Sequence, residues 1–400
     1  MCLTPRVSKY VTRWRPQPFR NAAEAAERDP ETIKHALQTA RHTQTVNPAL
    51  PPVFTLKHLA ELTNNEYFTL RSVVKRDEPD PYRIFRIRKR PSFEGEQRFR
   101  IITVPQPSLL RTQRWIAQSI LANTTPHAAS VAFAKGSKIR DAAIPHCGGR
   151  WLIKLDVRNF FESISEISVY RVFRSLGYQS LISFEMSRIC TRLGGATRMK
   201  AKKRWWADQD RWSIDSYRIY RHWSGPTLGH LPQGAPTSPM LANLAMRTFD
   251  DEVDAIADAH GLAFTRYADD LTLSSRADFD RAKVAHIIGQ VYSVMGRHGL
   301  SPNVTKTRVT PPGSRKIVLG LLVDGKQPKL PREFKQTMRR HIHYLTRPDV
   351  GPVRHAQARG FASTTGLKHH IQGLLGFAKQ IEPEYAATCR KALSAIDWPF

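Results

Sequence analysis

Apolar residues recur along the chain with the spacings of both helices and strands. From Thr55 to Val74 leucines and valines return every three or four residues, which predicts a helix. In residues 82–88 apolar and basic residues alternate, which predicts a strand with one basic face. A second strand at 98–104, after a turn around Gly95, would complete a basic β-hairpin.

The rest of the chain mixes helices with short strands. Residues 1–50 are basic and weakly patterned, and they predict either an extended arm or loosely packed helices. Tight turns join pairs of strands, so we predict an α+β fold. Helical spacing recurs at 109–121, 165–192, 240–257, 281–298 and through most of 332–395. Short apolar runs typical of strands lie at 151–155, 264–267, 271–274 and 316–323.

Composition narrows the class of protein. Hydrophobic residues make up 41% of the 400 residues, which is enough for a sizeable core and argues against a disordered chain. No apolar run approaches the ~20 residues of a membrane span, and the basic N-terminus has no apolar core typical of a secretory signal. The four cysteines are scattered without a CxxC pair, so we expect neither disulfides nor a zinc site, and a cytoplasmic location.

The net charge points to a polyanionic partner. Lys and Arg number 62 against 34 Asp and Glu, a formal charge of +28. Such an excess attracts polyanions, of which nucleic acid is the commonest. A basic protein of ribosomal type, or one that is simply soluble, is the alternative that charge alone leaves open.

Two adjacent carboxylates stand between two apolar strands, in Tyr267-Ala268-Asp269-Asp270. Neighbouring carboxylates at a hairpin tip repel one another, and a divalent cation compensates that charge. Mg²⁺ prefers one or two carboxylates together with substrate phosphates. The alternative is an ordinary polar hairpin turn.

A third carboxylate, Asp156, ends the apolar run 151–155 and precedes Phe160 and Phe161. Together with Asp269 it could bridge two cations ~3.5–4 Å apart, the arrangement that supports in-line phosphoryl displacement. The alternative role of Asp156 is a helix N-cap, which the metal role does not exclude.

The segment 231–239, Leu-Pro-Gln-Gly-Ala-Pro-Thr-Ser-Pro, lies between these acidic elements. Its prolines and small residues predict a rigid loop with close backbone approach. Such a loop can hold a template base or an incoming nucleotide. It could also be an ordinary proline-rich turn before a helix.

The order of these three segments resembles that of reverse transcriptases, most nearly the bacterial retron-type enzymes and the related defence-associated and group II intron types. The resemblance extends from about residue 55 to residue 387. Weaker matches are Arg100-x-Ile102-x-x-Pro105, 113–116, 133–137, Asn303-x-x-Lys306, 372–377 and 381–383.

The resemblance implies a right-hand polymerase with fingers, a palm of antiparallel sheet plus helices, and a helical thumb. The implied divisions are a basic N-terminal extension at 1–54, fingers at 55–150, palm at 151–325 and thumb at 326–400. The palm would carry a basic, aromatic insert at about 196–223.

The resemblance also implies a two-metal site formed by Asp156, Asp269 and Asp270 with Val157. Two Mg²⁺ ions would be the cofactors, with Mn²⁺ as an alternative. A primer hydroxyl would attack the α-phosphate of a dNTP, and pyrophosphate would leave.

Further residues are implied in nucleotide binding. Phe161 would be a steric gate against the ribose 2′-OH, while Phe160 would pack in the core. Lys306 would donate a proton to pyrophosphate, or would simply be a solvated lysine. The remaining nucleotide-binding residues implied are Arg98, Arg100, Gln233 and Gly234.

Basic and aromatic residues predict surfaces for RNA. In the insert, cations would grip phosphates and aromatic rings would stack on bases, or those rings would instead pack on the palm. The insert residues expected to bind are Lys202, Lys203, Arg204 and Trp205. The thumb residues expected to face a duplex are Lys326, Lys329, Arg332, Lys335, Arg339 and Arg340. Surface positions or RNA contacts are expected for His341, His343, His369 and His370.

Two departures from the retron pattern keep its neighbours open. Ala142 stands where many retron enzymes have Asn in an Asn-Ala-x-x-His segment that here ends at His146, and 318–320 read Val-Leu-Gly rather than Val-Thr-Gly. His146 would contact a structured RNA or fill a packing role. A true retron enzyme and a neighbouring defence-associated class both remain.

The predicted function is RNA-directed DNA synthesis in a retron or related antiphage defence system. The enzyme would copy a dedicated structured noncoding RNA, as template and primer, into cDNA from dNTPs, without a membrane. An effector protein and a second copy of the chain are open as partners. The rivals are a template-independent or protein-primed DNA polymerase and a non-catalytic RNA-binding scaffold, and the three intact Asp residues argue against the scaffold.

Overall fold

The structure is a computed structural model, and it describes residues 14–77, 80–88, 99–134, 136–193 and 228–399. Two compact units make up the chain. Unit 1 consists of Met1–Lys135, Val157–Glu252 and Tyr292–Pro302, and unit 2 consists of Gly136–Asp156, Val253–Val291 and Asn303–Phe400. The predicted Gly95 turn and the insert at 196–223 lie outside the described residues.

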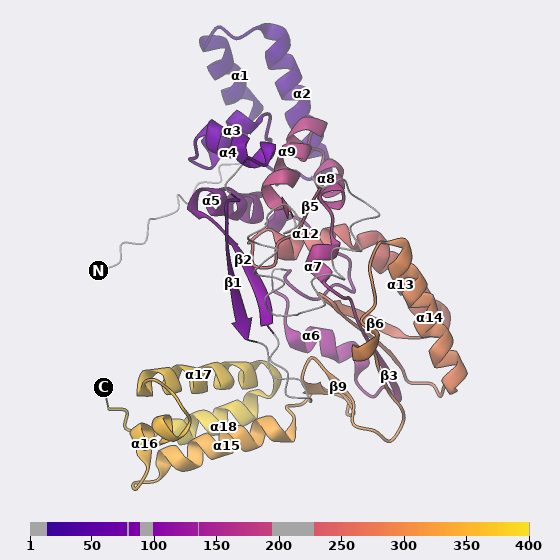
Figure 1. The fold of residues 1–400 in the computed structure, drawn as a ribbon, viewed down its shortest axis with the longest axis vertical. Coiled ribbons are helices and arrows are strands. Elements are labelled where there is room, and N and C mark those ends of the chain that lie inside the picture. Colours follow the sequence, from indigo (N-terminus) through magenta and orange to yellow (C-terminus); the bar gives the residue numbers. More distant parts are fainter. Residues whose placement is uncertain (1–13, 78–79, 89–98, 135, 194–227, 400) are drawn as a thin grey trace. The chain divides into compact units, whose positions relative to one another are not determined.

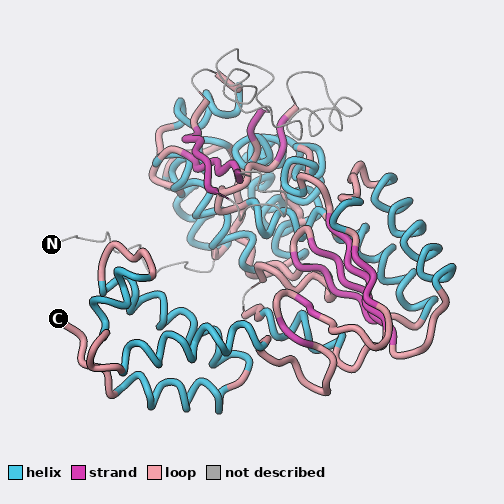
Figure 2. The backbone as a smooth tube through the Cα atoms, turned by 60° about the horizontal axis from the view of Figure 1, so that its bottom comes forward, coloured by secondary structure: helices cyan, strands magenta, loops and turns pink. Residues whose placement is uncertain are grey.

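A four-stranded antiparallel sheet is the centre of unit 2 (Figure 2). Its order is β6-β7-β3-β8. Strand β3 (Trp151–Asp156) pairs with β7 (Asp270–Ser275) and β8 (Arg308–Thr310), and β7 also pairs with β6 (Ala263–Tyr267). Most residues of β3 and β7 are buried, which explains why these runs are apolar almost throughout.

The segment predicted as one strand at 316–323 is instead a tight hairpin in unit 2. Strands β9 (Ile317–Val318) and β10 (Leu321–Leu322) pair around Leu319 and Gly320. Both turn residues are left-handed, with φ of 47° and 84°, as a two-residue type I′ turn requires. The expectation of a continuous strand was therefore wrong, because apolar spacing does not reveal a left-handed Leu.

Four helices close unit 2 (Figure 1), which confirms the helical expectation for 332–395. They are α15 (Arg332–Thr346), α16 (Gly351–Ala358), α17 (Thr364–Ile381) and α18 (Pro383–Ser394). One buried cluster, containing Met338, Leu345, Ala356, Leu367, Ile371 and Cys389, joins all four helices. A second joins α17 and α18 to the β9–β10 hairpin through Ala378, Ile381, Ala386, Val318 and Leu321.

Unit 1 is mainly helical. The expectation for 1–50 is tested only from residue 14 on, because residues 1–13 lie outside the described part of the chain. There the chain forms two helices, α1 (Pro16–Ala25) and α2 (Pro30–Val46), and α2 buries Ile33, Leu37 and Ala40. The other described α-helices that lie wholly in unit 1 are α3 (Leu56–Leu62), α4 (Tyr67–Lys75), α5 (Pro107–Trp115), α7 (Phe160–Ser163), α8 (Glu166–Ser175), α9 (Ser180–Cys190) and α12 (Ser238–Ala245). Helices α13 (Arg247–His260) and α14 (Arg281–Arg297) have residues in both units, and α6 (Ile139–Ala143) belongs to unit 2.

Three predicted helices are each broken in two. The expected helix at 55–74 is divided by Asn64, which is left-handed at φ 49°. The stretch 165–192 is divided between α8 and α9 by the left-handed Gly177, and 240–257 is divided at Met246. A continuous apolar spacing therefore overstates helix length, because it does not detect single residues that turn the chain.

Two small hairpins complete unit 1. Strands β1 (Tyr82–Arg88) and β2 (Phe99–Pro105) pair as predicted. Since alternate side chains point to opposite faces, Arg86 and Arg88 share one face while Arg83 lies on the other, so the basic residues are not confined to one face. Strands β4 (Arg192–Leu193) and β5 (Gly229–His230) pair at the two ends of the undescribed segment 194–227.

The described helices include none long and apolar enough to cross a membrane. Cys147, Cys190 and Cys389 are buried free thiols.

Candidate active site

Asp156 and Asp270 lie directly opposite each other on paired strands of unit 2. Directly opposite residues in an antiparallel pair place their Cβ atoms ~4.5–5.5 Å apart on one face, and like charges there destabilise the sheet. Asp156 is buried at the last position of β3, and Asp270 is half-buried at the first position of β7. Helix α7 takes Asn159 as its N-cap, so the capping role considered for Asp156 is wrong.

Asp269 occupies the two-residue turn that joins β6 to β7. Its neighbour Ala268 has φ 55°, a strained conformation for a residue with a side chain, and such strain collects at functional sites. The fully buried Arg266 donates from Nη1 to the Ala268 carbonyl oxygen at 3.1 Å. That hydrogen bond supports the strained turn and thereby the position of Asp269.

The electrostatics of the three carboxylates show mutual repulsion. Burial, together with the charges of Asp270 and Asp156, raises the pKa of Asp269 to about 6. Burial also raises the pKa of Asp270, against the opposing charge of Lys154. Crowded, partly desolvated carboxylates of this kind favour a compensating cation.

Two side chains from the segment between α14 and β8 hold Asp156 in place. Lys306 Nζ lies 2.7 Å from Oδ2, and Asn303 Nδ2 donates to Oδ1 at 2.8 Å. The Asn303 backbone N–H also donates to the Asp156 carbonyl oxygen at 2.8 Å. The predicted Asn303-x-x-Lys306 segment is therefore brought to the acidic end of β3.

The carboxylates fit a divalent metal by their chemistry. Carboxylate oxygens are the hard ligands that Mg²⁺ takes, and the raised pKa values are those of acids lacking a full counter-charge. No trio of His, Cys, Asp or Glu side chains in the described segments already converges as a metal-ligand set. Lys306 and Asn303 take the Asp156 oxygens instead. Val157, the fourth predicted ligand residue, is buried in unit 1 and forms an isolated antiparallel β-bridge with Pro302.

Phe161 and Phe160 occupy the short helix α7 of unit 1. Phe160 is buried, so its predicted core role is confirmed. Phe161 is half-buried, and its ring lies edge-on to Phe160 at 5.4 Å and tilted against Phe133 at 6.4 Å. Phe161 is thus a fixed aromatic surface that is still partly open.

The predicted close approach of the Pro-Gln-Gly loop is observed in unit 1. The Gln233 carbonyl oxygen accepts from the Thr103 N–H at 2.7 Å, which attaches the loop to β2. Gly234 has φ 116°, and a Cβ there would come within 2.8 Å of the Ile102 side chain. Only glycine fits this position. Arg100, on the same strand, is exposed.

The predicted RNA-contacting residues are described only in part. Lys326 and Lys329 are exposed in the loop before α15. Lys335 is less available than expected, because its Nζ pairs with Glu382 Oε2 at 2.6 Å. The residues Arg98, Lys202, Lys203, Arg204 and Trp205 lie outside the described part of the chain.

Two histidines considered for RNA contact are internal. His146 is buried and lies 2.7 Å from both Ser274 Oγ and Thr265 Oγ1, so a packing role is the one observed. His341 is buried against His355 at 2.9 Å, which makes a surface position for it wrong.

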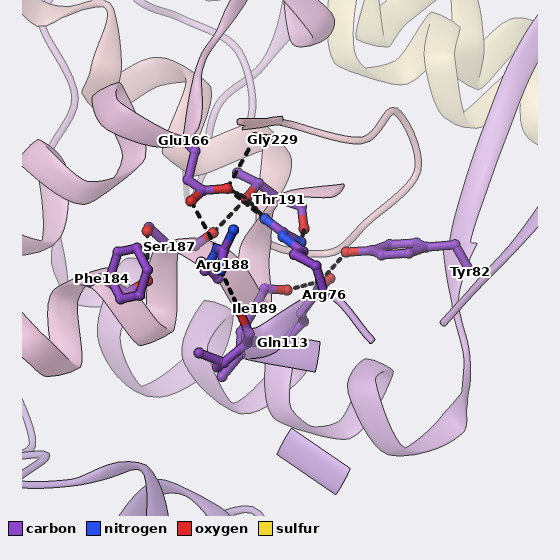
Figure 3. Close-up of polar contacts among 11 residues, drawn as sticks. Arg76, Tyr82, Gln113, Glu166, Phe184, Ser187, Arg188, Ile189, Thr191 and Gly229 are labelled. Atoms are coloured by element: carbon purple, nitrogen blue, oxygen red, sulfur yellow. Dashed lines mark hydrogen bonds and ion pairs between the residues drawn. The ribbon is translucent and has the colours of Figure 1, made fainter. Parts of the chain in front are cut away.

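A buried polar network in unit 1 was not foreseen (Figure 3). Arg76 Nη2 lies 2.6 Å from Glu166 Oε2, and Arg188 Nε lies 3.2 Å from Oε1. The Gly229 N–H donates to Glu166 Oε2 at 3.0 Å, and Arg76 Nη1 donates to the Thr191 carbonyl at 2.6 Å. The network therefore connects Thr191 and Gly229, which belong to the described parts of the chain before and after residues 194–227.

Lys154 and Arg266, which also lie at the acidic site, were not among the predicted site residues. Lys154 interrupts an apolar strand two positions before Asp156, so it shares a face with it and could have been noticed. Arg266 gave no such signal, because a basic residue in a short strand normally reaches solvent.

Comparison with known proteins now places the chain. The family model described as "Reverse transcriptase (RNA-dependent DNA polymerase)" matches residues 87–345, more than half of the sequence. The chain belongs to the reverse transcriptase family.

Its relatives point to one branch of that family. The chain is 29% identical to "Retron Ec86 reverse transcriptase" of Escherichia coli over 340 residues, covering 85% of this chain and 93% of the relative. It is 29% identical to "Retron Mx162 reverse transcriptase" of Myxococcus xanthus over 319 residues, covering 74% of this chain and 60% of the relative. The prediction of a retron-type, RNA-directed DNA polymerase is confirmed.

A solved structure also aligns with the chain. It is a telomerase from Candida albicans with a fragment of telomeric RNA, at 12% identity and a TM-score of 0.41. The alignment covers 82% of this chain and 57% of that one.

Proposed function

We propose that this reverse transcriptase copies a dedicated structured noncoding RNA into cDNA within a retron, using two Mg²⁺ ions at Asp156, Asp269 and Asp270. The proposal includes a right-hand arrangement, with fingers at 55–150, palm at 151–325 and thumb at 326–400. The observation that carries it is the pairing of Asp156 opposite Asp270, with Asp269 in the adjoining turn. Three like charges on one sheet end serve no packing purpose that a neutral residue would not serve better.

In this proposal the acidic residues and Lys306 contribute to different parts of nucleotidyl transfer. Divalent cations, when bound, activate the primer hydroxyl and stabilise the oxygen that leaves with pyrophosphate. Asp156 and Asp269 supply the anionic oxygens, and the backbone of β3 and the Arg266-supported turn hold them in place. Lys306 carries the proton that pyrophosphate needs as it leaves.

Nucleotide selection falls to unit 1 in this proposal. Phe161 presents a partly open ring that would exclude a ribose 2′-OH. Gln233 and Gly234, in the loop bonded to β2, would contact the nucleotide and template, and Arg100 would bind the triphosphate through charge-assisted hydrogen bonds. Arg98 is proposed for the same role from the sequence alone.

RNA binding is proposed for the basic surfaces. Exposed Lys326 and Lys329 suit backbone contacts with a duplex, and so do Arg332, Arg339 and Arg340. Lys202, Lys203, Arg204 and Trp205 remain proposals from sequence. An effector protein is proposed as a partner only on the resemblance to retron systems.

The test is to purify the full chain with the nucleic acid it retains and to sequence both RNA and DNA. We expect cDNA complementary to a bound RNA, synthesised from dNTPs with Mg²⁺. The double variant Asp269→Asn, Asp270→Asn should still bind the RNA but make no DNA. Unchanged DNA synthesis by that variant would rule out the metal-site assignment.

The same experiment separates the rivals. DNA whose sequence matches no bound RNA indicates template-independent synthesis. DNA that stays with the protein during extraction, and enters the aqueous phase only after protease treatment, is covalently attached to protein and indicates protein priming. RNA binding without any DNA synthesis by the unmodified chain would indicate a scaffold.

A further inference from the structure

The two side chains of the Lys306–Asp156 ion pair differ greatly in solvent exposure, and this difference bears on metal binding. The Asp156 side chain is 6% exposed, whereas the Lys306 side chain is 56% exposed. Lys306 ends a single 3₁₀ turn, Val304–Lys306, that contains no buried residue. A lysine on a flexible stem at such a position can leave its partner without disturbing the core. Asp156, fixed in β3, cannot move in the same way.

The charge of Lys306 acts on the acidic group through Asp156. Its Nζ lies 2.7 Å from Asp156 Oδ2, so the ammonium supplies part of the positive charge that the site lacks. Asn303, a neutral amide on the other Asp156 oxygen, supplies orientation but no charge.

We propose that Lys306 is an exchangeable counter-cation, which neutralises Asp156 in the metal-free enzyme and leaves it when a divalent cation binds there. This inference rests on the proposed metal site at Asp156, Asp269 and Asp270. Its consequence is a link between metal loading and the release of Lys306. The ammonium becomes free for an anionic phosphate only once the carboxylates have another cation.

The inference is tested by Mn²⁺ binding to the full chain, freed of nucleic acid and nucleotide, followed by the EPR signal of free Mn²⁺. Lys306→Ala removes the competing cation, so Mn²⁺ should bind roughly three- to tenfold more tightly than in the unmodified chain. Lys306→Arg keeps the charge and forms a more rigid pair, so Mn²⁺ should bind more weakly.

A matched control is Arg308→Ala, which removes one positive charge two residues further along from an exposed position on β8. It should change Mn²⁺ affinity less than twofold. Thermal unfolding of each variant checks that the fold is retained. Equal affinities in Lys306→Ala and Arg308→Ala, or weaker binding in Lys306→Ala, would overturn the exchange.

Asp269→Asn separates this failure from failure of the proposed function. If Asp269→Asn loses Mn²⁺ and Lys306→Ala shows no tightening, the metal site stands and the exchange is wrong. If Asp269→Asn binds Mn²⁺ as tightly as the unmodified chain, the metal site itself is wrong and the exchange falls with it.

Discussion

Two buried carboxylates ten residues apart in the sequence, Asp156 and Glu166, are neutralised in different ways. Each side chain is 6% exposed. Glu166 pairs with Arg76 and Arg188, which are themselves only 11% and 17% exposed. Asp156 pairs with a lysine that is mostly in solvent. Burial of the acid is the same, and only the exposure of its cation differs.

This difference separates a structural ion pair from an exchangeable one. The arginines of Glu166 also donate to the Thr191 and Val74 carbonyls, so they cannot leave without breaking backbone contacts. Gly229 adds a further constraint, because a Cβ there would come within 2.7 Å of both Arg76 and Glu166. Such crowding is typical of a fixed support, whereas the side chain of Lys306, the partner of Asp156, is 56% exposed.

The largest predicted effect is on folding stability, in Glu166→Gln. The change leaves two mostly buried guanidinium groups without their carboxylate, so the free energy of unfolding should fall by about 3–5 kcal/mol. Urea unfolding followed by circular dichroism measures it. Glu252→Gln is the control, since that acid pairs at the surface with Arg297 and His298 and should cost less than about 1 kcal/mol. Equal losses in the two variants would mean that the Glu166 network is not a support.

The second prediction has the opposite sign, in Asp269→Asn without divalent cations. The pKa of Asp269 is raised to about 6, above its unfolded value of about 3.9. The folded carboxyl therefore holds its proton in the window between these values, and this stabilisation falls progressively as pH rises from about 3.9 to about 6. A neutral Asn side chain does not ionise and avoids that loss. The variant should therefore be more stable at pH 8, by about 1–2 kcal/mol, with about half of that gain at pH 5.

Thermal unfolding at the two pH values checks this, with Asp278→Asn as the charge-matched control. Asp278 forms an exposed pair with Arg150 and should show no gain at pH 8. A variant Asp269→Asn that is less stable than the unmodified chain at both pH values would contradict the repulsion inferred among the carboxylates.

The sequence predicted the strand end and the hairpin tip that carry the three carboxylates, because each of these parts is local. Asp156 follows an apolar run, and the pair Asp269 and Asp270 stands between two more, so strand ends and a hairpin tip could be read directly. The α+β class followed from the same short strands. What the sequence could not predict was the register that sets Asp156 opposite Asp270, because register depends on contacts more than a hundred residues apart.

The Glu166 network could not be predicted for the same reason. Arg76 lies 90 residues before Glu166, and no periodicity links the two positions. The broken helices failed for a different reason. Asn64 and Gly177 turn left-handed within stretches whose apolar spacing continues across them. Apolar spacing indicates which face is buried but not where the chain turns.

The last prediction concerns Phe161→Ala, a change that tests nucleotide selection rather than structural support. The ring is half-buried and packs on Phe160 and Phe133, so its loss should cost about 1–2 kcal/mol, less than the loss of Glu166. Its effect should fall on substrate choice, with ribonucleotide incorporation rising roughly tenfold or more relative to dNTP because the space for a 2′-OH opens. Phe160→Leu is the control, since it disturbs the adjacent core ring and should leave discrimination unchanged. Primer extension with each nucleotide type, giving kcat/KM for both, measures the ratio. If both variants alter that ratio equally, Phe161 acts through packing and is no gate.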